Sequence, residues 1–262
     1  MRATTSVGMA LAAALLATPA LGAPVTWNTC GTSLESCAHV TSPASKTTID
    51  SNTLKFTSNG EVLFAHAYRT TNNTPPYGNA KKTSITLWGG GIGAGGEAPS
   101  PEHGVDNNNP DEFILFMFPN DNFIPRSFML GFVENDADVI TYIGGAGTGF
   151  FTSLESGTFN WDSFIADPGA QGFVSELFGG NNKSVPVGVP QFFTNDASGR
   201  YLIIGARNEE GLPRCLAPCY DGRDYFKIEQ ITAKVAVPEP ATALLLATGL
   251  AGVLTARFRH RR

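Results

Sequence analysis

The sequence has little charge and few of the residues that usually perform catalysis. Charged residues make up 16% of its 262 residues, and it holds four histidines and four cysteines. No serine stands in a Gly-x-Ser-x-Gly turn and no His-Glu-x-x-His pair occurs, so two common hydrolase motifs are missing. The acidic residues show no spacing that selects a catalytic pair. We therefore expect that the protein is not an enzyme.

Helical periodicity is also scarce between the two ends of the chain. Short apolar or alternating segments are separated by turn residues, and Asn59-Gly60 between two alternating segments is a strong hairpin signal. The expected strands are 53–58, 61–70, 84–88, 112–118, 127–133, 138–143, 201–206 and 225–234. This pattern predicts an all-β fold, a single β-sandwich or jelly-roll-like domain over residues 23–236.

Two segments depart from this pattern. Residues 153–190 are expected to be a long excursion from the sandwich, with helical turns at 161–165 and 172–178. The glycine-rich segment 89–96 fits Gly-x-Gly-x-x-Gly, but Pro99 and Pro101 exclude the helix that would hold a dinucleotide. We expect a mobile glycine loop there and no nucleotide site.

The C-terminal segment 237–262 has three ordered parts. Pro238-Glu239-Pro240 comes first, an uncharged apolar run follows at 241–256, and four arginines lie within 257–262. As a helix, 16 residues extend about 24 Å, less than the roughly 30 Å of a hydrocarbon core, so this segment spans a membrane only with help from its flanks. The arginines provide that help and place the end at 257–262 in the cytoplasm.

These three parts resemble the PEP-CTERM sorting signal of Gram-negative bacteria. The resemblance implies recognition by an exosortase, a membrane cysteine peptidase, with cleavage near Pro240 and delivery to the cell surface or the exopolysaccharide matrix. An ordinary C-terminal membrane anchor is the alternative. The precursor is then held in the inner membrane by a short transmembrane helix, with its body in the periplasm.

The N-terminus indicates the same export route. Arg2 precedes a mostly apolar stretch, and small residues surround Gly22, so residues 1–22 are predicted to be a signal peptide. The mature chain 23–240 keeps 13 of the 18 basic residues and all 23 acidic ones, so its net charge is −10. Such a chain is a poor candidate for binding nucleic acid.

The four cysteines form two close pairs, Cys30 with Cys37 and Cys215 with Cys219. In an exported chain these residues predict disulfides. Pairing within each close pair is the simplest arrangement, and cross-pairing would join the first and last strands.

Two acidic loops suggest a metal site. Asp106 and Asp111 lie ahead of one apolar strand, and Asp136 and Asp138 follow the next. Hard cations take six to eight oxygen ligands from such loops, so calcium is the one cofactor that the sequence suggests. The alternative is that these residues only form turns.

Residues 103–145 also look similar to the body of one group of exosortase-sorted surface proteins. The resemblance implies a β-sandwich and brings no established activity. Outside the predicted strands, Trp161 and the pair Phe150-Phe151 could stack on sugar rings or close the edge of a core.

Together these features predict a secreted or cell-surface protein with a structural or carbohydrate-associating role in the envelope or exopolysaccharide matrix. Exosortase and exopolysaccharide are the expected partners. A calcium-dependent carbohydrate-binding module and an extracellular polysaccharide-acting hydrolase are the alternatives.

Overall fold

The computed structural model describes residues 20–30, 45–72, 75–88, 90–95, 104–107, 110–135, 137–145, 147, 149–179, 184–206 and 224–237. The chain divides into two compact units: one is Gly22–Val235, and the other combines Met1–Leu21 with Ala236–Arg262. Nearly all the described residues belong to the first unit.

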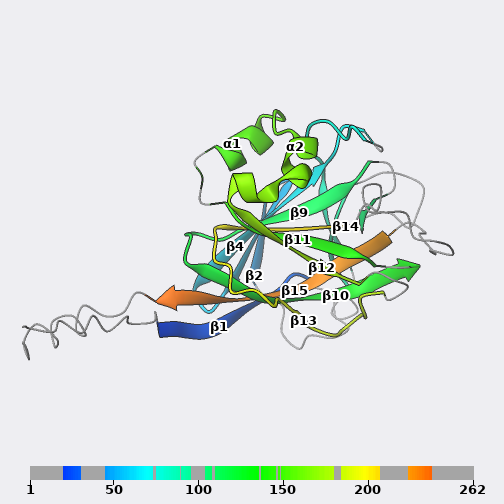
Figure 1. Ribbon diagram of the computed structural model, residues 1–262. Coiled ribbons are helices and arrows are strands. Elements are labelled where there is room, and N and C mark those ends of the chain that lie inside the picture. Colours follow the sequence, from blue (N-terminus) through cyan, green and yellow to red (C-terminus); the bar gives the residue numbers. More distant parts are fainter. Residues whose placement is uncertain are drawn as a thin grey trace, which may run out of the picture. The chain divides into compact units, whose positions relative to one another are not determined.

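Two antiparallel β-sheets form this unit (Figure 1). The seven-stranded sheet has the order β13-β10-β15-β7-β6, and β1 and β8 also pair with β15. Its strands are β1 Ala20–Asn28, β6 Ile85–Trp88, β7 Gly91–Ala94, β8 Val105–Asp106, β10 Phe123–Asn135, β13 Gln191–Phe192 and β15 Asp224–Val237. The long strand β15 is therefore the centre of this sheet.

The eight-stranded sheet has the order β12-β11-β14-β9-β4-β3-β2, with β5 paired to β4. Its strands are β2 Ser45–Asp50, β3 Thr53–Ser58, β4 Glu61–Arg69, β5 Lys81–Lys82, β9 Glu112–Met117, β11 Val139–Gly144, β12 Phe173–Phe178 and β14 Tyr201–Ala206. The predicted hairpin at Asn59-Gly60 is confirmed: it joins β3 to β4, and both residues have positive φ, 52° and 83°.

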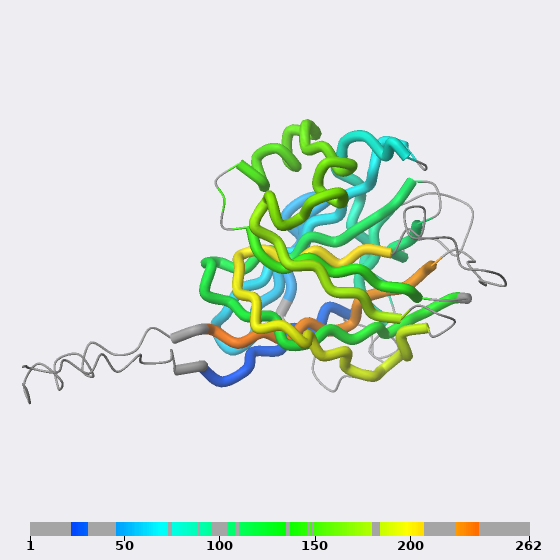
Figure 2. The backbone as a smooth tube through the Cα atoms, viewed as in Figure 1, coloured from blue at the N-terminus to red at the C-terminus, as the bar shows by residue number. Residues whose placement is uncertain are grey.

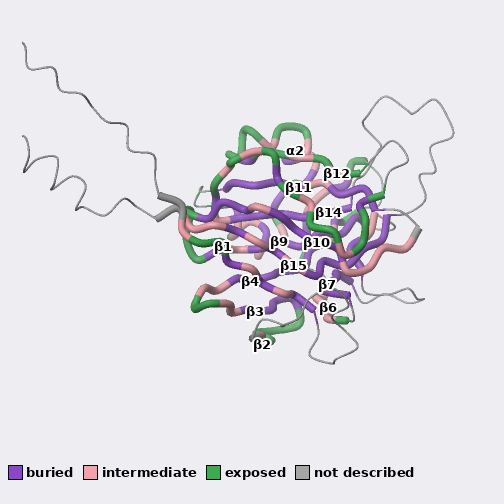
Figure 3. The backbone as a smooth tube through the Cα atoms, turned by 90° about the horizontal axis from the view of Figure 1, so that it is seen from below, coloured by how far each residue is buried: buried purple, intermediate pink, exposed green. Residues whose placement is uncertain are grey.

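The main hydrophobic core lies between the two sheets, where the buried residues gather (Figure 3). Alternate residues of β3 and β4, such as Phe56 and Leu63, point into it together with Phe226 and Ile228 of β15. Two sheets that share one core, with few helices, confirm the expected all-β class and sandwich arrangement.

A second core covers the other face of the eight-stranded sheet. Three short helices lie over this face (Figure 1): α1 Phe150–Glu155, α2 Trp161–Ala166 and the 3₁₀-helix η1 Pro168–Gln171. Trp161 stacks on Phe113 of β9 with ring centroids 4.2 Å apart. Because β9 has cores on both faces, its sequence is a continuous apolar run, and the predicted central strand at 112–118 is confirmed.

This second core contains the aromatic residues that lie outside the predicted strands. Phe150 and Trp161 are both buried, and Phe151 packs at the border of the same cluster. They close a core and do not form an exposed sugar-stacking surface.

The expectation of a mobile glycine loop at 89–96 is wrong for its described part, because Gly91–Ala94 is the buried strand β7. It pairs with β6 on one side and with β15 on the other. At Gly91 an added Cβ would lie 2.1 Å from the carbonyl oxygen of Ile228, so glycine lets the two backbones approach this closely.

The expected helical turns at 172–178 are also wrong, whereas those at 161–165 are confirmed by α2. Phe173–Phe178 is the edge strand β12, and all six of its residues pair with β11. Gly172, with φ 73°, ends η1 and allows the chain to turn into this strand.

Candidate functional site

The predicted calcium ligands are only partly brought together. Asp106 lies in β8 opposite Tyr225, and Asp111 and Asp138 are buried. Asp136 lies outside the described residues. Within the part of the chain that the structure describes, no three acidic, histidine or cysteine residues are grouped so that they could hold a metal. Calcium binding therefore stays a prediction.

Asp224, which the sequence did not single out, connects the two predicted loops. Its Oδ1 accepts a hydrogen bond from the backbone N–H of Asp138 at 2.8 Å, and its Oδ2 accepts one from Asn107 Nδ2 at 2.9 Å. Asn107 Oδ1 in turn accepts from the backbone N–H of Asp224 at 3.0 Å. The loop next to Asp106 and the start of β11 thus meet at the first residue of β15.

Several other predicted features lie outside the described residues. These are the signal sequence up to residue 19, Pro238, Glu239, Pro240, the predicted span 241–256, Cys37, Cys215 and Cys219. Cys30 is buried at the end of β1, and the pairing of the cysteines stays a prediction. None of the helices in the described part of the chain combines the length and the apolar character needed to cross a bilayer.

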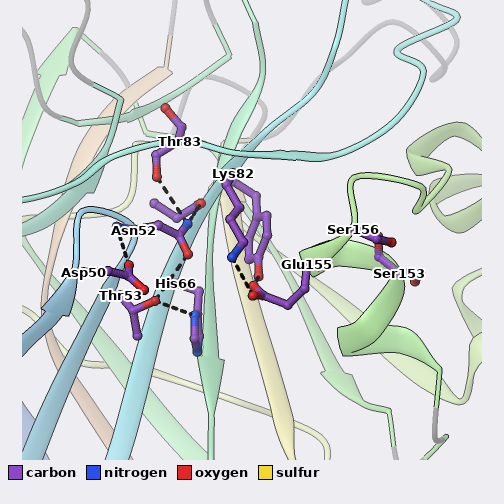
Figure 4. Close-up of polar contacts among 11 residues, drawn as sticks. Asp50, Asn52, Thr53, His66, Lys82, Thr83, Ser153, Glu155 and Ser156 are labelled. Carbon is purple, nitrogen blue, oxygen red and sulfur yellow. Dashed lines mark hydrogen bonds and ion pairs between the residues drawn. The ribbon is translucent and has the colours of Figure 1, made fainter.

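His66 on β4 is the centre of a buried polar cluster beneath α1 (Figure 4). The Thr53 hydroxyl lies 3.1 Å from His66 Nδ1, and the same hydroxyl donates to Asn52 Oδ1 at 3.3 Å. A Thr53 hydroxyl that gives its proton to Asn52 accepts from His66, so this arrangement fits the His66 tautomer with its proton on Nδ1. His66 Nε2 is buried without a hydrogen-bond partner, and the edge of the Phe151 ring packs against the imidazole at 5.0 Å.

Burial determines the charge of His66. It lowers the pKa of His66 to about 4, against the opposing effect of Glu155 and Asp50. The imidazole is therefore neutral at neutral pH.

Glu155 at the end of α1 fastens the helix to the sheet beside His66 (Figure 4). Its carboxylate accepts a hydrogen bond from the Tyr68 hydroxyl at 2.6 Å and forms an ion pair with Lys82 Nζ at 2.5 Å. Burial raises the pKa of Glu155, but the hydrogen bonds from Lys82 and Tyr68 outweigh burial, so the net shift is downward. These contacts connect α1 with β4 and β5, which is a structural role.

A different arrangement lies on the outer face of the seven-stranded sheet. In β6, Ile85 and Leu87 pack against the main core, so Trp88 points to the opposite face, and 52% of it is exposed. Lys227 of β15 places its Nζ 5.5 Å from the centre of the Trp88 ring and 5.0 Å from that of Phe132. Phe132 pairs directly with Lys227 across β10 and β15, and its ring meets Tyr225 edge to face at 5.8 Å.

The sequence alone does not reveal this cluster. The alternation of residues 84–88 would have placed Trp88 opposite Leu87, but it does not show that Lys227, 139 positions later, lies beside it. An exposed tryptophan with a lysine ammonium near its ring is suited to bind a ligand: the ring offers an apolar face and the ammonium offers hydrogen-bond donors.

Comparison with known protein families identifies residues 236–262 as matching the model of the PEP-CTERM protein-sorting motif. The chain carries a PEP-CTERM sorting motif. This confirms the resemblance drawn from Pro238-Glu239-Pro240, the apolar run and the arginines. The motif implies a secreted surface protein with exosortase as its processing partner. Comparisons with curated proteins and with solved structures found no significant match.

The PEP-CTERM motif begins inside the last strand of the sandwich. β15 ends at Val237, one residue after the motif begins, and Pro238 follows directly. Val235 still pairs with Phe123 of β10. In the sequence, the sorting motif is therefore joined to the central strand of the seven-stranded sheet with no linker.

Proposed function

We propose that the mature sandwich has a structural, carbohydrate-associating role in the envelope or the exopolysaccharide matrix. The observation that carries this proposal is Trp88, a half-exposed tryptophan on the outer face of the sheet that leads into the sorting motif. Aromatic rings on such faces stack on the apolar faces of sugar rings, and extended polysaccharides fit a flat sheet better than a deep pocket. The mature protein needs no catalytic activity for this role.

The proposed precursor is held in the inner membrane by the span 241–256, with the signal peptide removed after Gly22. The arrangement of β1 and β15 supports this proposal. These strands are neighbours in one sheet (Figure 2). Thr26 contacts Thr232 and Thr29 contacts Glu229, so the two strands run antiparallel. The chain therefore enters and leaves the sandwich at the same end of the sheet. Both membrane-directed segments are then attached to that end.

Binding to matrix polysaccharide tests the proposed role. The mature protein should be retarded by the exopolysaccharide of the producing strain in affinity electrophoresis, and Trp88→Ala should abolish most of the retardation. Leu177→Ala is the control, because Leu177 has a similar exposure, 49%, but lies on the edge strand of the other sheet. Equal retardation of the wild type and Trp88→Ala, or none for the wild type, would refute the proposal.

Calcium-dependent binding is a second candidate, favoured by the meeting of the two acidic loops at Asp224. Calcium-dependent binding is identified by electrophoretic retardation that a chelator abolishes. In that case, Asp136→Ala combined with Asp138→Ala lowers the melting temperature in calcium and leaves it unchanged in chelator. An equal loss in both conditions means that the two residues only build a turn.

A further inference from the structure

Lys227 is an unusual lysine, because only 8% of it is exposed. Lysine is rarely buried to this degree unless a negative charge is paired with it. Burial lowers the pKa of Lys227, and Glu134 only partly offsets this effect. The fold thus keeps an ammonium group in a place that costs free energy, which suggests that it serves a purpose other than stability.

The neighbours of Lys227 in the described structure leave its donors available. Trp88 and Phe132 attract the ammonium through their ring faces but accept no strong hydrogen bond. Glu134 acts on it at a distance, and no ion pair or hydrogen bond to Lys227 is formed within the described residues. Nζ is also not one of the fully hidden side-chain atoms without a hydrogen-bond partner in the described residues. The ammonium is therefore held in place by rings and can still reach an acceptor from outside.

We propose that Trp88 and Lys227 form a binding site for an acidic sugar unit of a polysaccharide, with a carboxylate of the ligand accepting hydrogen bonds from Lys227 Nζ. This inference rests on the proposed carbohydrate-associating role and names the ligand class. The sugar ring lies against the exposed part of Trp88, and the carboxylate takes the place of an anionic partner that the described residues do not provide. The Phe132 ring, with its centre 5.0 Å from Nζ, also holds the ammonium at this place.

The charge of the whole protein makes this local ammonium decisive. The mature chain has a net charge of −10, so a polyanion is not attracted by the surface as a whole. A neutral glycan would stack on Trp88 but would leave the hydrogen-bond donors of Lys227 bound to water. An acidic sugar both stacks on Trp88 and accepts hydrogen bonds from Lys227. A charge-assisted hydrogen bond at a partly desolvated site is stronger than one in water.

A matched pair of ligands tests the proposal. Polygalacturonate and its fully methyl-esterified form have the same sugar rings, and only the first has carboxylates. We expect the mature wild-type protein to bind the acidic polymer at least tenfold more tightly than the ester. Lys227→Gln should reduce this ratio to near one, and Lys227→Arg, which keeps the charge, should retain a preference for the acid.

Lys234→Gln is the control for net charge. Lys234 lies on the same strand, seven residues further on, which is about 23 Å along an extended chain. This variant should keep the wild-type preference, and thermal melting of all four proteins verifies that they are folded.

The result that would overturn the inference is a preference for the acid that survives in Lys227→Gln, or wild-type binding that is equal for acid and ester. If the wild type binds both polymers equally and Trp88→Ala binds neither, the carbohydrate-associating role stands and only the anionic specificity fails. Wild-type protein that binds neither polymer overturns the inference, and the matrix polysaccharide experiment then judges the broader proposal separately.

Discussion

Thr26 and Thr232 are 206 positions apart in the sequence, yet their hydroxyl oxygens lie 3.1 Å from each other. They belong to β1 and β15, which pair in the seven-stranded sheet. The backbone N–H of Thr29 also donates to the carbonyl of Glu229 at 2.7 Å. The first and last strands of the sandwich are therefore neighbours.

This pairing has a consequence for processing. If the antiparallel register of Thr26 with Thr232 continues for three more residues, Ala23 lies beside Val235. Ala23 is the predicted N-terminus after export, and the sorting motif begins at residue 236. The strand ends that lead to the predicted N-terminus and to the sorting motif are therefore adjacent in the sheet, and β1 supports β15 along that edge.

Trp27 should be the residue that most firmly fixes β1. It is fully buried, its ring contacts Phe118 and Phe123 at 5.9 and 6.1 Å, and its indole N–H donates to the Glu61 carbonyl. We expect Trp27→Ala to lower the free energy of unfolding by about 3–5 kcal/mol in urea titrations of the mature protein. Trp88→Ala should cost less than about 1 kcal/mol, because Trp88 is half exposed. Equal unfolding midpoints for the two variants would contradict this assignment.

His66 should make the stability of the protein depend on pH. Its pKa is about 4 in the folded state and about 6.5 when unfolded, so the unfolded chain binds the proton more tightly. Stability is then fully present above pH 6.5 and falls as the pH drops toward 4, by about 3 kcal/mol in total.

The matching variant is His66→Gln, which cannot gain that charge. The difference in unfolding free energy between pH 7 and pH 4.5 should be smaller in the variant than in the wild type. Glu155 and Asp50, whose pKa values are also lowered, lose their contributions at lower pH in both proteins. If the pH dependence is the same in both proteins, His66 is not buried in its neutral form.

Gly91 should be intolerant of any side chain. Its φ is +123°, and an added Cβ would overlap the Ile228 carbonyl of the central strand. We expect Gly91→Ala to destabilise the fold by about 3 kcal/mol or more, measured by chemical denaturation. Gly149→Ala is the control, because its φ is −128° and no atom lies within 4 Å of the added Cβ. A Gly91→Ala protein as stable as this control would show that β7 does not pack against β15.

Most strands could be predicted because their signals are local. Thr53–Ser58 and Tyr201–Ala206 have the predicted bounds, since alternation or a short apolar run between turn residues needs no information from elsewhere in the chain. The glycine strand β7 could not, because its sequence resembles a flexible loop. Only the backbone of β15 against Gly91 explains why glycine is required in that strand.

The functional features also divide into those that local sequence predicts and those that depend on the fold. The sorting motif could be recognised because its parts are adjacent in the sequence, from Pro238-Glu239-Pro240 to the terminal arginines. The pairing of Trp88 with Lys227 could not, because it depends on the register of β6, β7 and β15 in one sheet. The same holds for Asp224, whose role appears only when the start of β15 meets the acidic loops.

The sorting motif is tested most directly by the intact mass of the protein isolated from the surface and from the membranes of cells with and without the exosortase. In cells that contain it, we expect a chain that begins at Ala23 and ends near Pro240. In cells without it, and for a Glu239→Ala variant in either background, a membrane-held chain extending to Arg262 should accumulate. A surface protein that still contains residues 241–262 in the presence of the exosortase would contradict the account.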